Sequence, residues 1–215
     1  TKGSRCGIRA LKQVLGITET CSANTVGFRL APVINAAGRL AHGELGVRLL
    51  ISESEYQAIQ LAQKLVLLNR QRRHIEQEIF QQAKEILTKQ KQSSAIVIGS
   101  QNWHAGVIGI VASRLVEEFH RPSVVIALDI NCLGKGSVRS VQGYNVYQAL
   151  EQCGTHLERF GGHPAAAGLT IFAENFSSFQ QKFTKIVAAG MDETYKTPAL
   201  NIDVHVGLSD IQPSL

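Results

Sequence analysis

The order of apolar and polar residues divides the chain into a helical first part and an alternating second part. Apolar residues spaced three and four apart predict a helix over residues 8–15, which Gly16 ends. The same spacing predicts a short helix over residues 45–50. A loop rich in Thr, Ser and Asn follows the first of these helices.

Residues 26–40 form an apolar segment that two helix-disfavouring residues interrupt. Pro32 and Gly38 predict a loop here rather than a regular element. This loop would present Asn35 and Arg39 between hydrophobic anchors. The pair is a candidate phosphate-binding group, and the alternative is an ordinary polar loop tip.

Residues 53–91 are predicted to form one long helix. Ser52 or Ser54 can cap its start, and no Gly or Pro interrupts it. At 1.5 Å per residue it would be about 55–60 Å long, which is the length of a spacer between two lobes. The alternative is two helices with a break that the sequence does not signal. The apolar stripe consists of Ala58, Leu61, Leu65, Leu68, Ile75, Ile79, Ala83 and Ile86.

After residue 93 short apolar runs alternate with helical patterns, which predicts a layered α/β domain. The short link between the second and third strands predicts an antiparallel hairpin, so the sheet should be mixed. Strands are expected at residues 95–99, 123–128, 133–141, 167–172 and 200–206, and helices at residues 106–119, 144–153 and 175–189.

The charge distribution indicates a polyanionic partner. The 215 residues carry a net charge of +5, and the first 50 residues, with seven Lys or Arg against two Glu, account for all of it. No apolar run is long enough to span a bilayer and no signal peptide is evident, so no membrane association is expected. The chain does not begin with Met, and we expect it to be part of a longer protein.

The cysteines and aspartates exclude several kinds of site. None of the four cysteines forms a C-x-x-C pair, which favours reduced thiols in a cytoplasmic protein over a zinc or redox site. The first 128 residues contain no aspartate, and the seven histidines are scattered. A two-metal phosphodiester hydrolysis site needs clustered carboxylates. We therefore expect no catalytic or metal-binding residue within this chain.

Gly161, Gly162 and His163 form the most informative motif. Two glycines allow a ligand to approach the backbone closely, and an imidazole beside them can donate to a phosphate. Residues 164–167 were expected to open a short helix, whose positive end would add to an anion site. The alternative is a tight turn between a helix and a strand, with His163 as a cap.

Two further segments carry candidate binding residues. Ser137 and Arg139 share one face of a glycine-rich strand and can hold a phosphate together; the alternative is a charged edge strand that deters aggregation. Trp103 and His104 lie between a strand and a helix. Trp103 could stack on a base, although a core position is favoured, and His104 could contact phosphate.

These motifs, taken in order, resemble the RecJ family of the DHH phosphoesterase superfamily. The resemblance rests on Asn35–Leu40, Trp103–Arg114, Gly136–Ser140 and Gly161–His163 followed by Ala166–Gly168. It implies the C-terminal half of a catalytic core, with its DHHA1 domain, from a 5′→3′ exonuclease specific for single-stranded DNA that acts in recombination and repair. Oligoribonucleases, cyclic-dinucleotide phosphodiesterases and alanyl-tRNA synthetase tails share the Gly-Gly-His motif.

The resemblance implies a division of labour within the parent enzyme. A DHH domain, absent from this sequence, would hold Mn²⁺ or Mg²⁺, and this chain alone would be inactive. Single-stranded DNA is the expected partner, and single-strand-binding protein is a candidate second one. The implied phosphate- or strand-binding residues are Arg39, Ser137, Arg139, Gly161, Gly162 and His163, followed by Asn35, Trp103 and His104.

We accordingly expect four segments. Residues 1–52 would be the end of the DHH-side lobe, 53–92 the connecting helix, 93–198 the DHHA1 domain with a mixed sheet and flanking helices, and 199–215 the start of a following OB-type domain. Two other functions stay open: an oligoribonuclease or cyclic-dinucleotide phosphodiesterase, and a non-enzymatic nucleic-acid-binding module.

Overall fold

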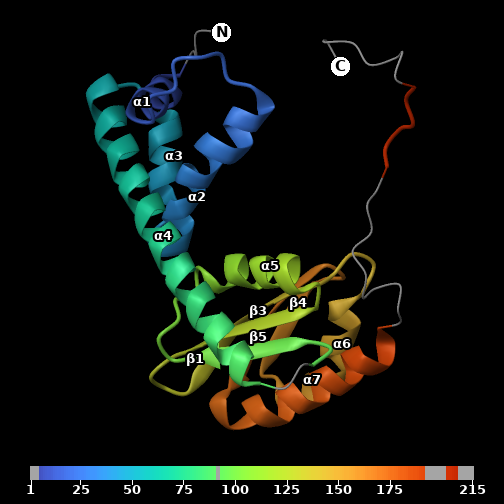
Figure 1. The fold of residues 1–215 in the computed structure, drawn as a ribbon. Helices are drawn as coiled ribbons and strands as arrows, with labels where there is room; N and C mark the ends of the chain where they lie inside the picture. Colours follow the sequence, from blue (N-terminus) through green and yellow to red (C-terminus); the bar gives the residue numbers. More distant parts are fainter. Residues whose placement is uncertain (1–4, 91–92, 192–201, 208–215) are drawn as a thin grey trace.

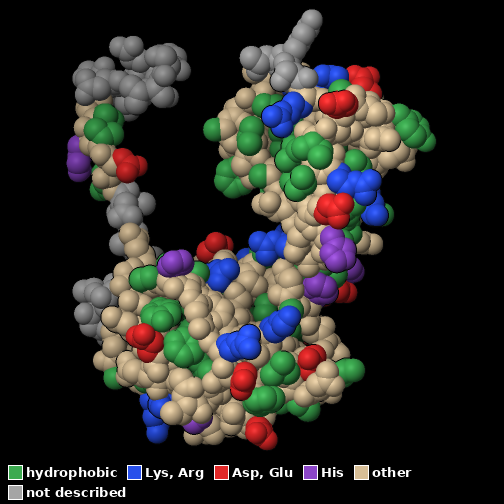
Figure 2. Space-filling view, turned by 180° about the vertical axis from the view of Figure 1, so that it is seen from behind, with side chains coloured by type: hydrophobic (Ala, Val, Ile, Leu, Met, Phe, Trp, Pro, Cys, Tyr) green, Lys and Arg blue, Asp and Glu red, His purple; other side chains and the backbone are tan. Residues whose placement is uncertain are grey.

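The chain forms a helical lobe and a sheet domain that are joined by one long helix (Figure 1). The structure is a computed structural model that describes residues 5–90, 93–191 and 202–207. The predicted architecture of a mixed α/β domain, a long helix and a small helical N-terminal segment is confirmed. Figure 2 shows that the surface is hollowed between the two parts.

The helical lobe packs three helices against the first half of the long helix. Its elements are α1 (Cys6–Val14), a π-helical turn (Thr25–Leu30), α2 (Ala31–Leu40) and α3 (Glu44–Ile51), all beside α4 (Glu55–Lys89). Leu11, Leu49 and Leu65 are fully buried in the shared core. Because each short helix buries one apolar stripe, most of their stability comes from this packing rather than from helix propensity.

The expected loop at residues 26–40 is wrong, because the whole segment is helical: the π-helical turn runs directly into α2. Pro32 lies in the first turn of α2, where its missing N–H is not needed. Val33, Ala36 and Ala37 are buried against the lobe, and this burial outweighs the weak helix propensity of Gly38. Tertiary packing thus makes this segment a helix, although Pro32 and Gly38 locally indicated a loop.

The long helix is continuous, as predicted. The Ser54 hydroxyl accepts a hydrogen bond from the Gln57 amide (3.4 Å), so Ser54 is the N-cap. At mid-helix, Glu76 pairs with Arg72 (2.5 Å) and with Arg114 of the sheet domain (3.1 Å). The side chains of Arg72 and Glu76 are only 11% and 12% exposed. This polar network fixes the long helix against the sheet domain.

The sheet has five strands in the order β1-β2-β3-β5-β4. Only β1 and β2 are parallel, and the predicted β2–β3 hairpin is present, so the sheet is mixed. The strands are β1 (Ile96–Ser100), β2 (Ser123–Leu128), β3 (Leu133–Arg139), β4 (Arg159–His163) and β5 (Ala166–Phe172).

Different helices cover the two faces of the sheet. The end of α4 and α5 (Ile108–Phe119) lie on the face turned toward the helical lobe (Figure 1). Helices α6 (Val146–Gln152) and α7 (Phe176–Gly190) pack on the opposite face, where Phe179 and Phe183 are fully buried. Because α5 packs on β2 and β3, it leaves the same face of β5 and β4 uncovered.

Two further expectations differ from the structure. Residues 164–167 open no helix: Pro164 and Ala165 form the turn between β4 and β5, and their carbonyls accept from Val146 (3.0 Å) and Ser140 (3.0 Å). The ladder between β4 and β5 uses the backbone that a helix would need. The expected last strand at 200–206 is wrong for residues 202–206, which are not in a strand; its first two residues lie outside the described ones.

Removal of Glu76 should destabilise the protein. Glu76→Ala leaves the largely buried Arg72 side chain without its carboxylate, which we expect to cost about 3–5 kcal/mol in the free energy of unfolding. Urea unfolding followed by circular dichroism measures this loss in the free energy of unfolding. Glu78→Ala is the matched control, because Glu78 is 56% exposed and should change stability by less than about 0.5 kcal/mol. Equal effects of the two variants would contradict the network.

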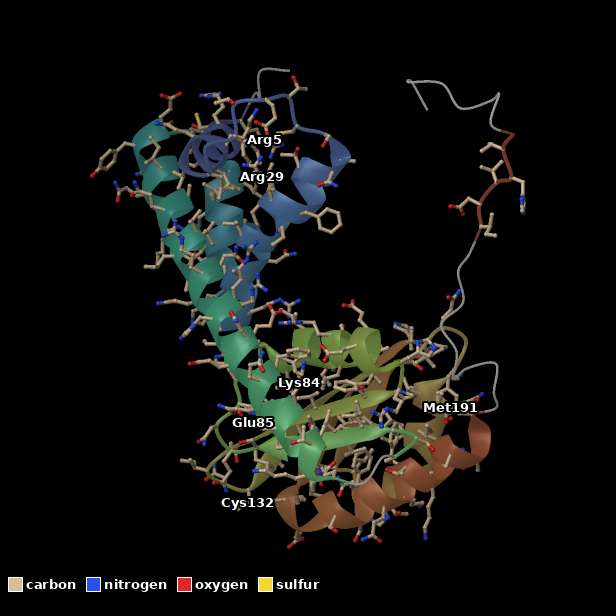
Figure 3. All side chains as sticks on the ribbon, in the orientation of Figure 1. Arg5, Arg29, Lys84, Glu85, Cys132 and Met191 are labelled. Carbon is tan, nitrogen blue, oxygen red and sulfur yellow. The ribbon has the colours of Figure 1, made fainter. Side chains whose placement is uncertain are left out.

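The four cysteines are free thiols, and they should differ sharply in reactivity. Burial raises the pKa of the Cys153 thiol to about 11. Cys132 is exposed at the β2–β3 hairpin, far from Arg5 and Arg29 of the helical lobe (Figure 3). Because the thiolate is the reactive form, iodoacetamide at neutral pH should label Cys132 and leave Cys153 unmodified until the protein is unfolded, as read by peptide mass spectrometry.

Candidate nucleic-acid interface

The β3 and β4 motifs face the same side of the sheet, separated only by β5. Arg139 pairs with Ala166, which pairs in turn with His163. Ser137 pairs with Gly168, which pairs with Gly161. Directly paired residues project to the same face, so Arg139, Ser137 and His163 all project to the α5 side. The sheet therefore brings together two motifs that the sequence separates by more than twenty residues.

We call the α5-side surface of β5 and β4, together with the residues of β3 that border it beside α5, the open face. On β5, Ala167, Leu169 and Ile171 point into the core on the other side, which leaves the alternate residues on the open face. Lys and Arg side chains, a His and an acidic side chain lie where the sheet domain borders the hollow (Figure 2). The open face consists of Leu133, Lys135, Ser137 and Arg139 on β3, Ala166, Gly168, Thr170 and Phe172 on β5, and Arg159, Gly161 and His163 on β4.

Arg139 is held in place by its own strand and by the start of α5. Its Nη1 donates to the Ser137 hydroxyl (2.9 Å) and to the Val138 carbonyl (2.8 Å). A Cβ on Gly109 would lie 3.2 Å from Nη2, so the glycine leaves room for the guanidinium. Burial lowers the pKa of Arg139, and the charge of Arg39 lowers it further. Both effects disfavour the free cation and would be reversed by a bound anion.

Arg39 comes from the helical lobe, in the last turn of α2. Its Nη1 donates to the Gly106 carbonyl (3.2 Å) in the loop before α5. A Cβ on Gly106 would meet the Arg39 carbonyl at 2.0 Å, so only glycine allows this approach. Asn35 lies one turn earlier in α2, on the same helix side as Arg39, and both are exposed. The helix thus aligns the two residues that a loop was expected to present.

His104 and Trp103, which precede Gly106 in the loop before α5, have different environments. His104 is exposed, and its Nδ1 accepts from the Gly106 amide (3.1 Å), so the neutral ring carries its proton on Nε2 and can donate it. Trp103 is 5% exposed, and its indole N–H donates to Gln82 of α4 (2.8 Å). This burial favours the core position of Trp103 over base stacking.

The glycines of the β4 motif differ in what they require. Gly162 has φ +149°, and a Cβ there would lie 2.5 Å from the Ala166 carbonyl oxygen, so the fold itself demands glycine. A Cβ on Gly161 would meet no atom within 4 Å, and one on Gly168 would meet only the Gly136 carbonyl at 3.8 Å. No contact within the described structure requires glycine at these two positions. Their bare backbone instead forms a floor that a ligand can approach.

The electrostatics of this site suit an anion. Among residues 5–90, 93–191 and 202–207, neither Arg39 nor Arg139 forms an ion pair with a carboxylate. Two guanidinium groups, a hydroxyl and imidazole N–H donors match the oxygens of phosphate groups. Within the same ranges, no three His, Cys, Asp or Glu side chains come close enough to hold a metal ion. No helix there is long and apolar enough to cross a membrane.

Sequence reasoning missed Lys135, Arg159 and Thr170 of the open face and the space left by Gly109. The signal for Lys135 was present, because it alternates with Ser137 and Arg139 along one strand. Arg159 alternates with Gly161 in the same way, but residues 159–163 were not expected to form a strand.

Alanine at the two β4 glycines should have opposite effects on stability. Gly161→Ala fits without strain and should leave the free energy of unfolding unchanged or raise it by up to about 1 kcal/mol. Gly162→Ala forces a Cβ into the β5 backbone and should lower it by more than about 2 kcal/mol. Thermal unfolding of the two variants measures this contrast, and similar melting temperatures would contradict the assigned roles.

Comparisons with known proteins agree with this architecture. The DHHA1 domain model matches residues 65–189. The single-stranded-DNA-specific exonuclease RecJ of Bacillus subtilis is 36% identical over 212 residues, which cover 97% of this chain and 27% of that protein. The Escherichia coli RecJ is 38% identical over 198 residues, covering 87% and 34%. The chain thus spans about a third or less of these relatives.

Solved structures give the same result. The crystal structure of Thermus thermophilus RecJ in complex with Mg²⁺ superposes with a TM-score of 0.77 at 34% identity, covering 86% of this chain and 29% of that one. A structure of exonuclease RecJ bound to manganese gives a TM-score of 0.78 at 34% identity, covering 90% and 48%.

Proposed function

The chain belongs to the DHHA1 family and is homologous to a segment of RecJ, and we propose that it is the substrate-binding half of a single-stranded-DNA exonuclease. The observation that carries the proposal is that Arg39 is held at the Gly106 carbonyl and Arg139 lies against Gly109 at the start of α5, and that neither forms an ion pair with a carboxylate among the described residues. Like charges held together in a folded protein are destabilising unless an anion joins them. Each phosphodiester group of a nucleic-acid backbone carries one negative charge on two exposed non-bridging oxygens.

Each residue has a defined part in this proposal. Arg139 and Ser137 hold one backbone phosphate, and His163 approaches it from β4 across the floor of Ala166. Arg39 and Asn35 contact the DNA strand from the helical lobe, and His104 donates a hydrogen bond from Nε2 to a phosphate oxygen. Gly161 and Gly168 let the sugar–phosphate backbone lie close to the sheet, whereas Gly162 shapes β4. Trp103 supports α4 from the core.

Hydrolysis itself belongs, in this proposal, to another part of the parent protein. The RecJ structures named above hold Mg²⁺ or manganese, and a divalent metal is accordingly proposed for the parent enzyme. The described residues here offer no set of metal ligands, so they do not fit that role. The proposed role of this chain is to bind and orient the DNA strand, and the chain alone is inactive.

The wider setting follows from the same proposal. We place residues 1–52 with the metal-binding lobe, 53–92 as the connecting helix, 93–198 as the DHHA1 domain and 199–215 at the start of a following domain. Free thiols at all four cysteines suit the cytoplasm. Degradation of single strands serves recombination and repair, and single-strand-binding protein is the proposed delivery partner.

Arg139 gives the direct test in the natural full-length protein. Loss of one charge-assisted phosphate contact is worth about 1.5–3 kcal/mol, so Arg139→Met should lower kcat/KM on 5′-phosphorylated single-stranded DNA by ~10- to 100-fold. The melting temperature should stay close to that of the wild type, because the lost hydrogen bonds are offset by removal of a poorly solvated charge. Lys185→Met, on exposed α7 at the other face, is the matched control.

A substrate panel separates this function from its alternatives. The wild-type protein should degrade single-stranded DNA in preference to duplex DNA, short RNA and cyclic dinucleotides. Preference for short RNA or cyclic dinucleotides would replace the proposal by a phosphodiesterase of that type. Binding without hydrolysis of any of these substrates, with metal supplied, would leave a nucleic-acid-binding module.

A further inference from the structure

The open face continues beyond the residues assigned above. One row further along the sheet, Lys135 pairs with Thr170, and Thr170 pairs with Arg159. All three project to the same side as Arg139 and His163. Lys135 and Arg159 are exposed, and neither forms an ion pair within the described ranges. A second pair of cations without carboxylate partners therefore lies beside the first site.

We call the strip of the open face between β3 and β4 the trough. Its sides are the longer side chains of β3 and β4, and its floor is the row of small residues Ala166, Gly168 and Thr170 on β5. The outer strands are two strand spacings apart, about 9–10 Å. This width admits one nucleic-acid strand, whereas a double helix is too wide to reach the floor. Helix α5 stands beside the trough on β2 and β3.

The spacing along the trough suits a phosphodiester chain. Arg139 and Lys135 are four residues apart on β3, which corresponds to about 13 Å. An extended sugar–phosphate backbone covers this distance in about two nucleotide steps. Beyond Lys135 the face ends on Phe172, which pairs with Leu133 and is 42% exposed. An exposed aromatic ring at the end of a cationic groove is a platform for base stacking.

We propose that Lys135, Thr170 and Arg159 bind a second backbone phosphate, about two nucleotides from the one at Arg139, and that Phe172 stacks the base beyond it. The inference rests on the proposed function and adds the path that the DNA strand follows along the open face. The small side chains of the floor and the placement of Arg139 and Lys135 on β3, opposite Arg159 on β4, favour single-stranded nucleic acid over an acidic protein segment, because a phosphodiester chain carries one charge at each step.

The test compares two substrates in the natural full-length protein. We would measure binding, by anisotropy at several salt concentrations, of a 5′-phosphorylated dT oligonucleotide of about twelve nucleotides and of the 5′-phosphorylated dT dinucleotide. The double variant Lys135→Gln/Arg159→Gln should weaken binding of the oligonucleotide by ~10-fold or more and reduce its salt slope by about 0.7, the contribution of one phosphate. Binding of the dinucleotide should be unchanged, because it does not reach the second row.

Matched variants make each outcome decisive. Lys182→Gln/Lys185→Gln removes the same charge from α7 and should leave both substrates unaffected. Phe172→Ala should weaken binding of the oligonucleotide only, and Phe172→Tyr should restore it. A double variant that binds the oligonucleotide like the wild type overturns this inference and leaves the proposed function intact. A wild-type protein that binds neither substrate overturns both.

Discussion

The close approach of α2 to the loop before α5, at Gly106, holds the two parts of the molecule in one arrangement. The Arg39 carbonyl lies where any side chain at position 106 would sit, and the Arg39 guanidinium returns to the Gly106 carbonyl. The α4 helix spans the same junction, fixed by Glu76 between Arg72 and Arg114. These two contacts determine where the helical lobe faces the sheet, and therefore which residues border the hollow.

The consequence of that arrangement is electrostatic. Arg39 arrives beside Arg139, whose guanidinium is already poorly hydrated because it lies between β3 and the start of α5. Burial of a charge without a carboxylate costs free energy, and the neighbouring like charge adds to the cost. A site of this kind is preorganised, because the donors occupy their positions before the anion binds. In the proposed function, a bound phosphate would remove the cost that the free protein bears.

The glycines divide into those that the fold needs and those that it does not. Gly106 and Gly162 occupy positions where a Cβ would collide with backbone. A Cβ at Gly161 would meet no atom within 4 Å and one at Gly168 only the Gly136 carbonyl at 3.8 Å, yet both glycines lie on the face with cations that form no ion pair among the described residues. A glycine that packing does not explain, beside unpaired donors, is best understood as space kept for a ligand. The same reasoning extends to the small residues that form the floor of the trough.

The sequence by itself determined the continuous α4 helix, most of the strands and helices after residue 93 and the mixed sheet, since periodicity and glycine spacing are local signals; Ser137, Arg139 and His163 stay predicted binding residues. It did not determine the conformation of residues 31–40, where burial of Val33 and Ala37 overrides Pro32 and Gly38. Nor could it place β4 beside β5, because strand pairing joins the segments across a turn that locally resembled a helix start. Only the tertiary structure decided that Arg39 reaches Gly106 while Arg139 lies against Gly109, and that Lys135 and Arg159 share a row, because these placements depend on contacts between residues far apart in the chain.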